Sequence, residues 1–298
     1  MKKILINLLL CFIPGKNLRK RIRLYFSVKT FSPPPAEKFF QWRQNKGKMT
    51  TLILGSSHGL YGYRAEGSEF NLCDVSQDLY YSCRLYALSC DFPQLKTVVL
   101  FYSVFSPGHV LEKTAENIKC LFYKELYHIP YRFLPDNSFP VEKEQFDKFM
   151  RSFRSDPVPE ERNGNCKEYT FFPADVTAEQ RAAGHMKNNK RPDSQNGFIV
   201  ETARLAARKG HRFVIVVPPF RSDYRNCLPD FEDMFSELSK IVRQEKNIEL
   251  ISFLDDKDFT QADFGDTDHL TLNGAVKLTR KIRQQLNESH FSGSSINK

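Results

Sequence analysis

Residues 51–60 read TLILGSSHGL, an apolar run that ends abruptly in small and polar residues. The run has the continuous apolar character of a strand that is buried on both faces of a parallel sheet. The Gly-Ser-Ser-His-Gly that follows has no obvious place in a core. It is either a turn and nothing more, or the strand exists to present a hydroxyl group at its carboxyl end.

Similar apolar runs recur along the chain and alternate with segments of helical spacing. The predicted strands cover residues 50–57, 96–103, 211–219 and 247–253. The predicted helices cover about residues 76–89, 193–209, 230–245 and 272–287. Because strands that alternate with helices pair in parallel, the sequence predicts an α/β fold with a mostly parallel sheet.

The predicted organisation is one α/β domain with additions. Residues 1–48 form a basic arm that ends in a proline-rich linker, and residues 49–290 form the domain. Residues from about 105 to 190 are aromatic and weakly periodic, so we expect a large insertion of irregular helices and loops there. Such an insertion either shapes a substrate site or only fills space. Residues 291–298 are expected to be a disordered tail.

Positive charge is concentrated in the arm. The net charge is +9, from 44 basic and 35 acidic residues, and residues 1–48 hold twelve of the basic residues and one of the acidic ones. The rest of the chain is therefore close to neutral. Because basic residues do not line the domain as they would a nucleic-acid groove, we expect no nucleic-acid partner.

The arm has the pattern of a membrane-surface helix. Leu18, Ile22 and Tyr25 recur at helical spacing among arginine and lysine residues. This pattern predicts that residues 1–30 bind an anionic membrane surface, and the alternative is a basic helix packed on the protein itself. The apolar run at residues 4–13 is too short to cross a bilayer.

The same segment bears on localisation. A signal peptide is an alternative for the apolar run, but Pro14-Gly15-Lys16 offers no small-residue cleavage site. The seven cysteines include no Cys-x-x-Cys pair and indicate a reduced compartment. We therefore expect a peripheral protein at the cytoplasmic face of the inner membrane. The alternative is an exported protein with an uncleaved N-terminal anchor.

Two short motifs could carry chemistry. A serine just after the first strand would lie at the carboxyl edge of the sheet, where ligands bind in open α/β folds. Near the other end, Asp266-Thr267-Asp268-His269 precedes the last helix, and a carboxylate three residues before a histidine can orient its ring. The alternative is that an aspartate caps the helix and the histidine lies at the surface.

Together the motifs resemble the SGNH/GDSL hydrolase superfamily, in its divergent Gly-Ser-Ser branch related to polysaccharide and cell-wall acyl transfer. The resemblance implies a flavodoxin-like three-layer sandwich, with Ser57 as the nucleophile, His269 as the base and Asp266 as its orienter. Asp268 is less well placed for that role. The resemblance implies neither a metal nor a cofactor.

The chain departs from the family in two blocks that supply the oxyanion hole. The second block, residues 70–77, has no glycine, and no asparagine follows the strand at residues 96–103. The loss of one oxyanion donor can cost about 3 kcal/mol of transition-state stabilisation. The expected substitutes and neighbouring residues are Ser56, Asn71, Cys73, Ser76 and Ser103.

The substrate is expected to be an acylated carbohydrate or a lipid-linked glycan. Arg181 and His185, one helical turn apart in the insertion, are candidates to bind an anionic or sugar substrate. FIPGKNLRKRIR, residues 12–23, resembles leaders of enzymes of bacterial surface-polysaccharide and lipopolysaccharide assembly. The sequence thus predicts a serine esterase or O-acetyltransferase. The alternative is an inactive or weakly active SGNH-like protein that binds a glycan at the membrane.

Overall fold

A computed structural model describes the backbone of most of the chain. It covers residues 35–139, 163–166, 169, 171, 176–189 and 194–293. The predictions for residues 1–34, including the apolar run and the basic helix, lie outside these residues. Within them, helix α3 (Pro35–Asn45) begins at the last proline of the predicted linker, so that prediction is wrong from Pro35 onward. Proline is compatible with the first turn of a helix, where its missing N–H group is not needed.

A single five-stranded, all-parallel sheet confirms the predicted α/β class. Its strands are β1 (Thr51–Gly55), β2 (Glu69–Asn71), β3 (Thr97–Phe101), β4 (Arg212–Val217) and β5 (Ile248–Ser252), in the order β2-β1-β3-β4-β5. The chain passes from β1 to β2 on one side and then to β3 on the other, and Gly55 pairs with Phe101. This reversal places the end of β1 at the switch point of the sheet, where ligands bind in doubly wound folds.

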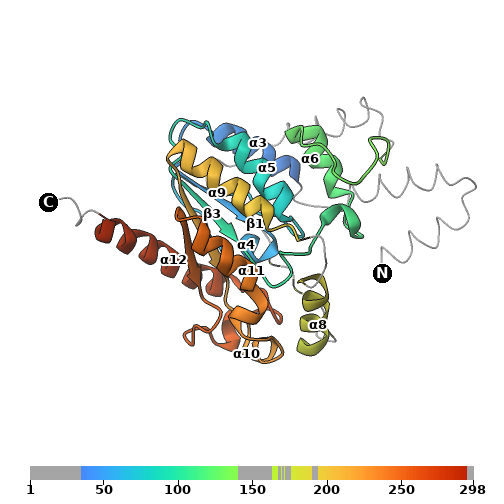
Figure 1. The fold of residues 1–298 in the computed structure, drawn as a ribbon, viewed down its shortest axis with the longest axis vertical. Helices are drawn as coiled ribbons and strands as arrows, with labels where there is room; N and C mark the ends of the chain where they lie inside the picture. Colours follow the sequence, from blue (N-terminus) through green and yellow to red (C-terminus); the bar gives the residue numbers. More distant parts are fainter. Residues whose placement is uncertain are drawn as a thin grey trace, which may run out of the picture. The chain divides into compact units, whose positions relative to one another are not determined.

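Helices flank the sheet on both faces in a flavodoxin-like three-layer sandwich (Figure 1). The larger helices are α5 (Leu79–Ser89), α9 (Gly197–Lys209), α11 (Phe231–Gln244) and α12 (Leu272–Gly293). Shorter helices of the same compact unit as the sheet are α4 (Ser57–Leu60), α8 (Ala178–Asn189), α10 (Ser222–Arg225) and η3 (Gln261–Asp263), and a separate unit holds η1 (Leu111–Lys113) and α6 (Lys119–Tyr127). Because α12 continues to Gly293, the predicted tail is wrong for residues 291–293.

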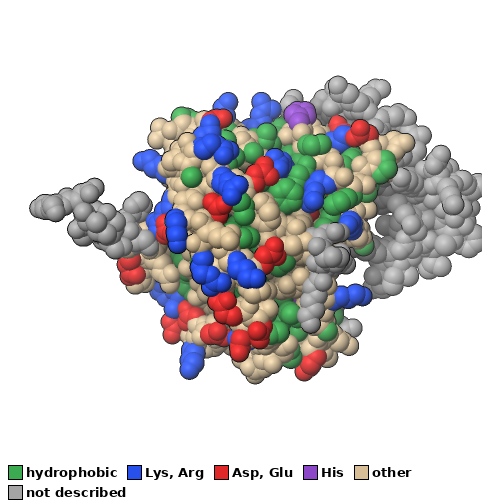
Figure 2. Space-filling view, viewed as in Figure 1, with side chains coloured by type: hydrophobic (Ala, Val, Ile, Leu, Met, Phe, Trp, Pro, Cys, Tyr) green, Lys and Arg blue, Asp and Glu red, His purple; other side chains and the backbone are tan. Residues whose placement is uncertain are grey.

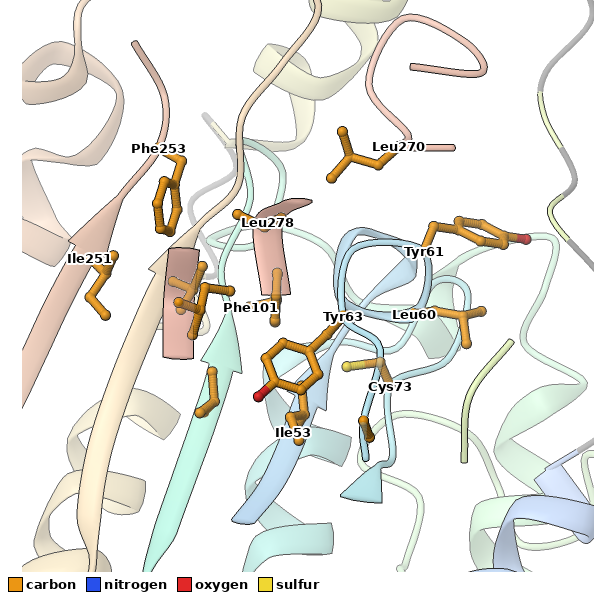
Figure 3. Close-up of a cluster of buried hydrophobic side chains, with 14 of the residues drawn as sticks. Ile53, Leu60, Tyr61, Tyr63, Cys73, Phe101, Ile251, Phe253, Leu270 and Leu278 are labelled. Atoms are coloured by element: carbon orange, nitrogen blue, oxygen red, sulfur yellow. The ribbon is translucent and has the colours of Figure 1, made fainter. Parts of the chain in front are cut away.

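The two-residue period of the strands determines which side chains enter the core on each face of the sheet. Ile53, Val99 and Val214 point to the sheet face that packs against Leu278 and Ile282 of α12. Figure 3 shows this cluster continuing to Tyr61 and Leu270, which flank the loop before α12. The core therefore joins the sheet to the segments that follow β1 and precede α12.

The chain divides into two compact units. One contains residues 1–40 and 111–159 and the other contains residues 41–110 and 160–298. In the first unit, the buried carboxylate of Glu112 accepts the backbone N–H groups of Arg132, Phe133 and Leu134. The sheet lies in the second unit. Residues 105–110 and 160–190 of the predicted insertion belong to the unit of the sheet, and residues 111–159 belong to the other unit.

The surface carries charges of both signs. Basic and acidic side chains are interspersed on the face shown in Figure 2. Among the residues that the structure describes, no helix combines the length and the apolar character needed to cross a bilayer.

Gly55 is essential to the end of β1. Its φ is +133°, and an added β-carbon would lie 2.7 Å from the carbonyl oxygen of Phe101 on the neighbouring strand. Only glycine fits this conformation and this close approach. The chain can therefore turn sharply between β1 and Ser57.

Gly55→Ala should lower the free energy of unfolding by about 3 kcal/mol, because strain and a steric clash add. Gly184→Ala is the matched control, since an added β-carbon there meets no atom within 4 Å. It should be neutral or stabilise α8 by up to about 1 kcal/mol. Urea unfolding of the two variants measures the difference, and equal midpoints would contradict this account of Gly55.

Candidate active site

Ser57 is the first residue of α4, directly after the turn at Gly55. Ser56 precedes the helix with an extended backbone, and the first helical hydrogen bonds run from Gly59 and Leu60 to the carbonyl of Ser56. The backbone N–H groups of Ser57 and His58 come before these donors, as in the first turn of any helix. The serine hydroxyl and these N–H groups thus lie together at the carboxyl edge of the sheet.

The loop before α12 is closed by its own backbone. Phe264 and Leu270 form an antiparallel bridge, and the N–H of Gly265 donates to the carbonyl of His269 over 3.0 Å. Inside the loop, one oxygen of Asp266 accepts the backbone N–H groups of Asp268 (3.0 Å) and His269 (2.7 Å). These contacts fix the loop independently of the histidine ring.

Ser57, His269 and Asp266 form a continuous hydrogen-bonded chain. His269 Nε2 lies 2.8 Å from Ser57 Oγ, and His269 Nδ1 lies 2.8 Å from Asp266 Oδ2. All three residues are buried. Burial pushes the pKa of Asp266 upward, but the hydrogen bond and charge of His269 outweigh it and hold the pKa below its ordinary range. The carboxylate is therefore available to fix the ring with Nε2 facing the serine.

A second polar group adjoins this triad. Arg181 of α8 binds Asp268 in a bidentate ion pair, with both N–O distances 3.0 Å. His58 Nε2 lies 3.2 Å from Asp268 Oδ2, the oxygen that also accepts from Arg181 Nη2. Among the described residues this buried nitrogen has no directed hydrogen bond, so its contact with Asp268 is a close electrostatic one. Asp268 is thus held by Arg181 and by the Thr267 hydroxyl, which donates to Asp268 Oδ1 over 3.0 Å, with the His58 ring beside it.

Aromatic rings enclose the two histidines. The ring of His58 lies 5.6 Å from those of Phe105 and Phe220, and 5.2 Å from that of His269. On the other side, Tyr61 makes an edge-to-face contact with His269 at 5.3 Å. These contacts keep water from the triad and fix both rings.

Two of the predicted oxyanion donors serve the fold. The Asn71 amide donates to the carbonyls of Gly59 (3.0 Å) and Tyr63 (2.9 Å), and its oxygen accepts the N–H of Cys73. The predicted roles of Asn71 and Cys73 as oxyanion donors are therefore not supported. A polar residue at a strand end is as useful for holding two loops as for binding a ligand.

The other three predicted residues differ in position. The Ser103 N–H donates to Ser106 Oγ, which ties Ser103 into the turn after β3. Ser76 has a left-handed backbone with φ of 61°, and its carbonyl lies 3.0 Å from His109 Nε2. Ser56 lies beside the triad, with its Oγ 3.5 Å from His58 Nδ1. Ser56 is thus within reach of a polar group of the site.

The predicted substrate-binding pair is engaged with the protein. Arg181 binds Asp268, as described above, and His185 is buried with its Nδ1 2.5 Å from the Tyr224 hydroxyl. Burial lowers the pKa of His185 well below its ordinary value. Both residues lie near the triad, and their contacts with Asp268 and Tyr224 do not support the expectation that they hold substrate directly. Arg181 is committed to Asp268.

His58, Asp268 and His269 lie close enough together to be considered as metal ligands. One potential ligand atom of each lies within 4.8 Å of the others. However, His269 Nε2 faces the Ser57 hydroxyl, and the Asp268 carboxylate already binds the guanidinium of Arg181. A cation would have to displace both contacts next to a fixed positive charge, so these residues do not fit a metal site.

His58 was not among the residues that the sequence singled out, and Asp268 was singled out only as a less well placed orienter of His269. The signal was present, because both lie inside the two quoted motifs, each next to a member of the triad. What no local pattern could show is the partner of Asp268, which lies 87 residues away on α8.

Comparisons with known proteins add little to this geometry. No protein-family model matches the chain, and no curated protein sequence is significantly similar to it. One similar solved structure is that of a Bacteroides fragilis protein described provisionally as an acylhydrolase. The two share 11% sequence identity at a TM-score of 0.40, over 83% of this chain and 94% of that chain. The function of the site is therefore argued from its own residues.

The buried histidines should make the protein acid-sensitive. Burial lowers the folded-state pKa of His58 and His185 from 6.5, so the unfolded chain binds protons first as the pH falls. Stability is thus fully present above pH 6.5 and declines below it, by up to about 1.4 kcal/mol per pH unit for each histidine. His185→Gln should remove the contribution of His185 to this loss of stability. Urea unfolding at pH 7.5 and 5.5 measures it, and equal declines for both proteins would refute it.

Proposed function

We propose that this chain is an SGNH-type serine enzyme that cleaves or transfers an O-acyl group, most simply acetyl, on a carbohydrate. The observation that carries the proposal is the unbroken chain of two 2.8 Å contacts from Ser57 through His269 to Asp266. A serine, a histidine and a buried carboxylate in this geometry can activate a hydroxyl group for attack on an ester.

The proposed reaction has two half-reactions, acylation and deacylation of Ser57, and both use the same three side chains. Ser57 Oγ attacks the acyl carbonyl while His269 Nε2 takes its proton, and Asp266 stabilises the imidazolium that forms. The tetrahedral oxyanion would be met by the backbone N–H groups at the start of α4, including that of Ser57 itself. The imidazolium then returns the proton to the leaving alcohol. Water or a sugar hydroxyl, activated by the same base, accepts the acyl group from Ser57.

Aromatic side chains beside the triad support a carbohydrate substrate. Tyr61 contacts the ring of His269 and also lies near Tyr169 (5.5 Å) and Phe171 (6.4 Å). Phe171 is partly exposed, and aromatic faces of this kind stack on sugar rings. The last two residues belong to the predicted insertion, which agrees with its expected part in shaping a substrate site.

A specific observation favours a second candidate, an SGNH-like glycan-binding protein with little or no activity. Asn71 and the N–H of Cys73, which could have replaced the missing oxyanion donors, are bound to the protein. An oxyanion hole that relies on fewer donors stabilises the transition state less, by about 3 kcal/mol for each one lost. The two candidates differ in whether Ser57 reacts at all.

Ser57→Ala should abolish both the hydrolysis of an aryl acetate and covalent labelling by a fluorophosphonate probe. Ser252→Ala, at the exposed end of β5 on the same edge of the sheet, is the matched control and should keep both. Loss of a triad serine typically costs several orders of magnitude in rate. If wild-type protein is not labelled, the binding protein is the better candidate; if Ser57→Ala is still labelled, the nucleophile is another residue.

We also propose that residues 1–30 hold the protein at an anionic membrane surface, in the assembly of a bacterial surface polysaccharide or lipopolysaccharide. The charge and apolar spacing of the arm support this. Replacement of Arg19, Lys20, Arg21 and Arg23 by glutamine should reduce binding to phosphatidylserine-containing vesicles about a thousandfold, since each of the four charges contributes about 1 kcal/mol. Vesicle sedimentation at low salt measures this, and unchanged binding would contradict it.

A further inference from the structure

The two motifs contain more chemistry than the proposed triad uses. The two motifs also contain a second serine, histidine and aspartate, namely Ser56 and His58 beside Ser57 and Asp268 beside His269. These neighbours are aligned in the same order as the triad. Ser56 Oγ lies 3.5 Å from His58 Nδ1, and His58 Nε2 lies 3.2 Å from Asp268 Oδ2. Arg181 ends this second chain with its bidentate contact to Asp268.

The charges of the second chain balance one another. Burial alone would raise the pKa of Asp268, but His269, His58 and Arg181 together hold it well below its ordinary range, so the group is a carboxylate. Burial lowers the pKa of His58, so its ring is neutral at neutral pH. This second row of side chains thus consists of the Asp268 anion, the Arg181 cation and the neutral imidazole of His58, which lies between Asp268 and Ser56.

This second row of side chains lies next to His269, the proposed base. The centroids of the His58 and His269 rings are 5.2 Å apart and the ring planes are inclined by 31°, so the two rings are neighbours in a tilted arrangement. An oxygen of Asp268 lies within 4.8 Å of a nitrogen of each ring. His269 therefore faces two carboxylates, Asp266 through a hydrogen bond and Asp268 through space. The positive charge of Arg181 offsets the second one.

We propose that Arg181, Asp268 and His58 form a positioning chain that fixes the ring of His269 and sets the local charge under which it accepts the proton of Ser57. This inference rests on the proposed function of the triad. Arg181 thereby acts on the reaction through Asp268 and not by binding substrate. His58 packs against the ring of His269 and limits its movement.

A merely structural role explains the arrangement poorly. The His58 nitrogen that faces Asp268 is buried without a directed hydrogen bond among the described residues, which costs stability. A buried ion pair is often no more stable than apolar residues of the same volume. Burial of an arginine, an aspartate and a histidine around the proposed base is therefore better explained by the charge that they provide.

The charged and titratable groups around His269 come from four segments. They are Asp266 and Asp268 of its own loop, His58 and Tyr61 at α4, Arg181 and His185 of α8, and Arg221 with Asp223 and Tyr224 at α10. Arg221 is itself paired with Asp223 at 2.7 Å. Removal of either Arg181 or Asp268 therefore leaves one unbalanced charge next to the base.

The test compares two single variants and the double variant of Arg181 and Asp268. For each one, the rate of fluorophosphonate labelling is measured as a function of pH. Asp268→Asn leaves the Arg181 cation unbalanced and disfavours the imidazolium. It should lower the acidic midpoint of the labelling rate by about one pH unit. Arg181→Met leaves the carboxylate unbalanced and should raise the midpoint by about the same amount. The double variant restores neutrality and should return the midpoint to the wild-type value.

The chain offers a matched control in the bidentate pair of Arg212 and Glu249, with N–O distances of 2.5 and 2.6 Å, on β4 and β5. Arg212→Met and Glu249→Gln should change the urea midpoint without moving the pH profile. If Arg181→Met does not fold, Arg181→Lys keeps the charge and should keep the midpoint, while Asp268→Asn still tests the shift. His58→Gln should lower the maximal labelling rate several-fold, because the ring that supports His269 is lost.

The outcomes separate this inference from the proposed function. Ser57→Ala is run in the same assay, and labelling that survives it overturns the triad and this inference together. If Ser57→Ala abolishes labelling but Asp268→Asn and Arg181→Met share the wild-type midpoint, or shift it in the same direction, only the charge-setting role is overturned. Opposite shifts that cancel in the double variant support it, since a general loss of packing would not change sign with charge.

Discussion

The carboxylate of Asp266 is the interaction on which the site depends, because it organises both the loop and the ring. One of its oxygens accepts two backbone N–H groups of the loop, and the other accepts the Nδ1 proton of His269. The loop therefore cannot change its shape without releasing the imidazole. The geometry that faces Ser57 is in this way built into the backbone and does not rely on the freedom of long side chains.

The parallel sheet supplies the other half of the geometry. Its strand order makes the chain reverse direction next to β1, and Gly55 allows a turn that no other residue could make so close to Phe101. Ser57 therefore emerges at the switch point of the sheet. Leu278 and Ile282 pack α12 against the same sheet, which brings the loop before that helix to the same edge. The two motifs meet because one core holds both.

The sequence was informative where local patterns determine structure. Continuous apolar runs revealed four of the five strands, and the two motifs predicted which side chains meet at the sheet edge. Strand β2 was missed because Glu69–Asn71 is too short and too polar to show a period. Asn71 was misread because an amide that binds two carbonyls looks, in sequence, like one that faces a ligand. The pairing of Arg181 with Asp268 depends on tertiary packing alone.

The bidentate contact between Arg181 and Asp268 also bears on how this protein can evolve. Each residue is tolerable in its buried position because the other is present, so a single replacement passes through a less favourable intermediate. The two positions are therefore expected to covary among relatives, either retained together or exchanged together for a neutral pair. A homologue that has lost both would need another way to support its histidine, and the residue next to its serine is the place to look for one.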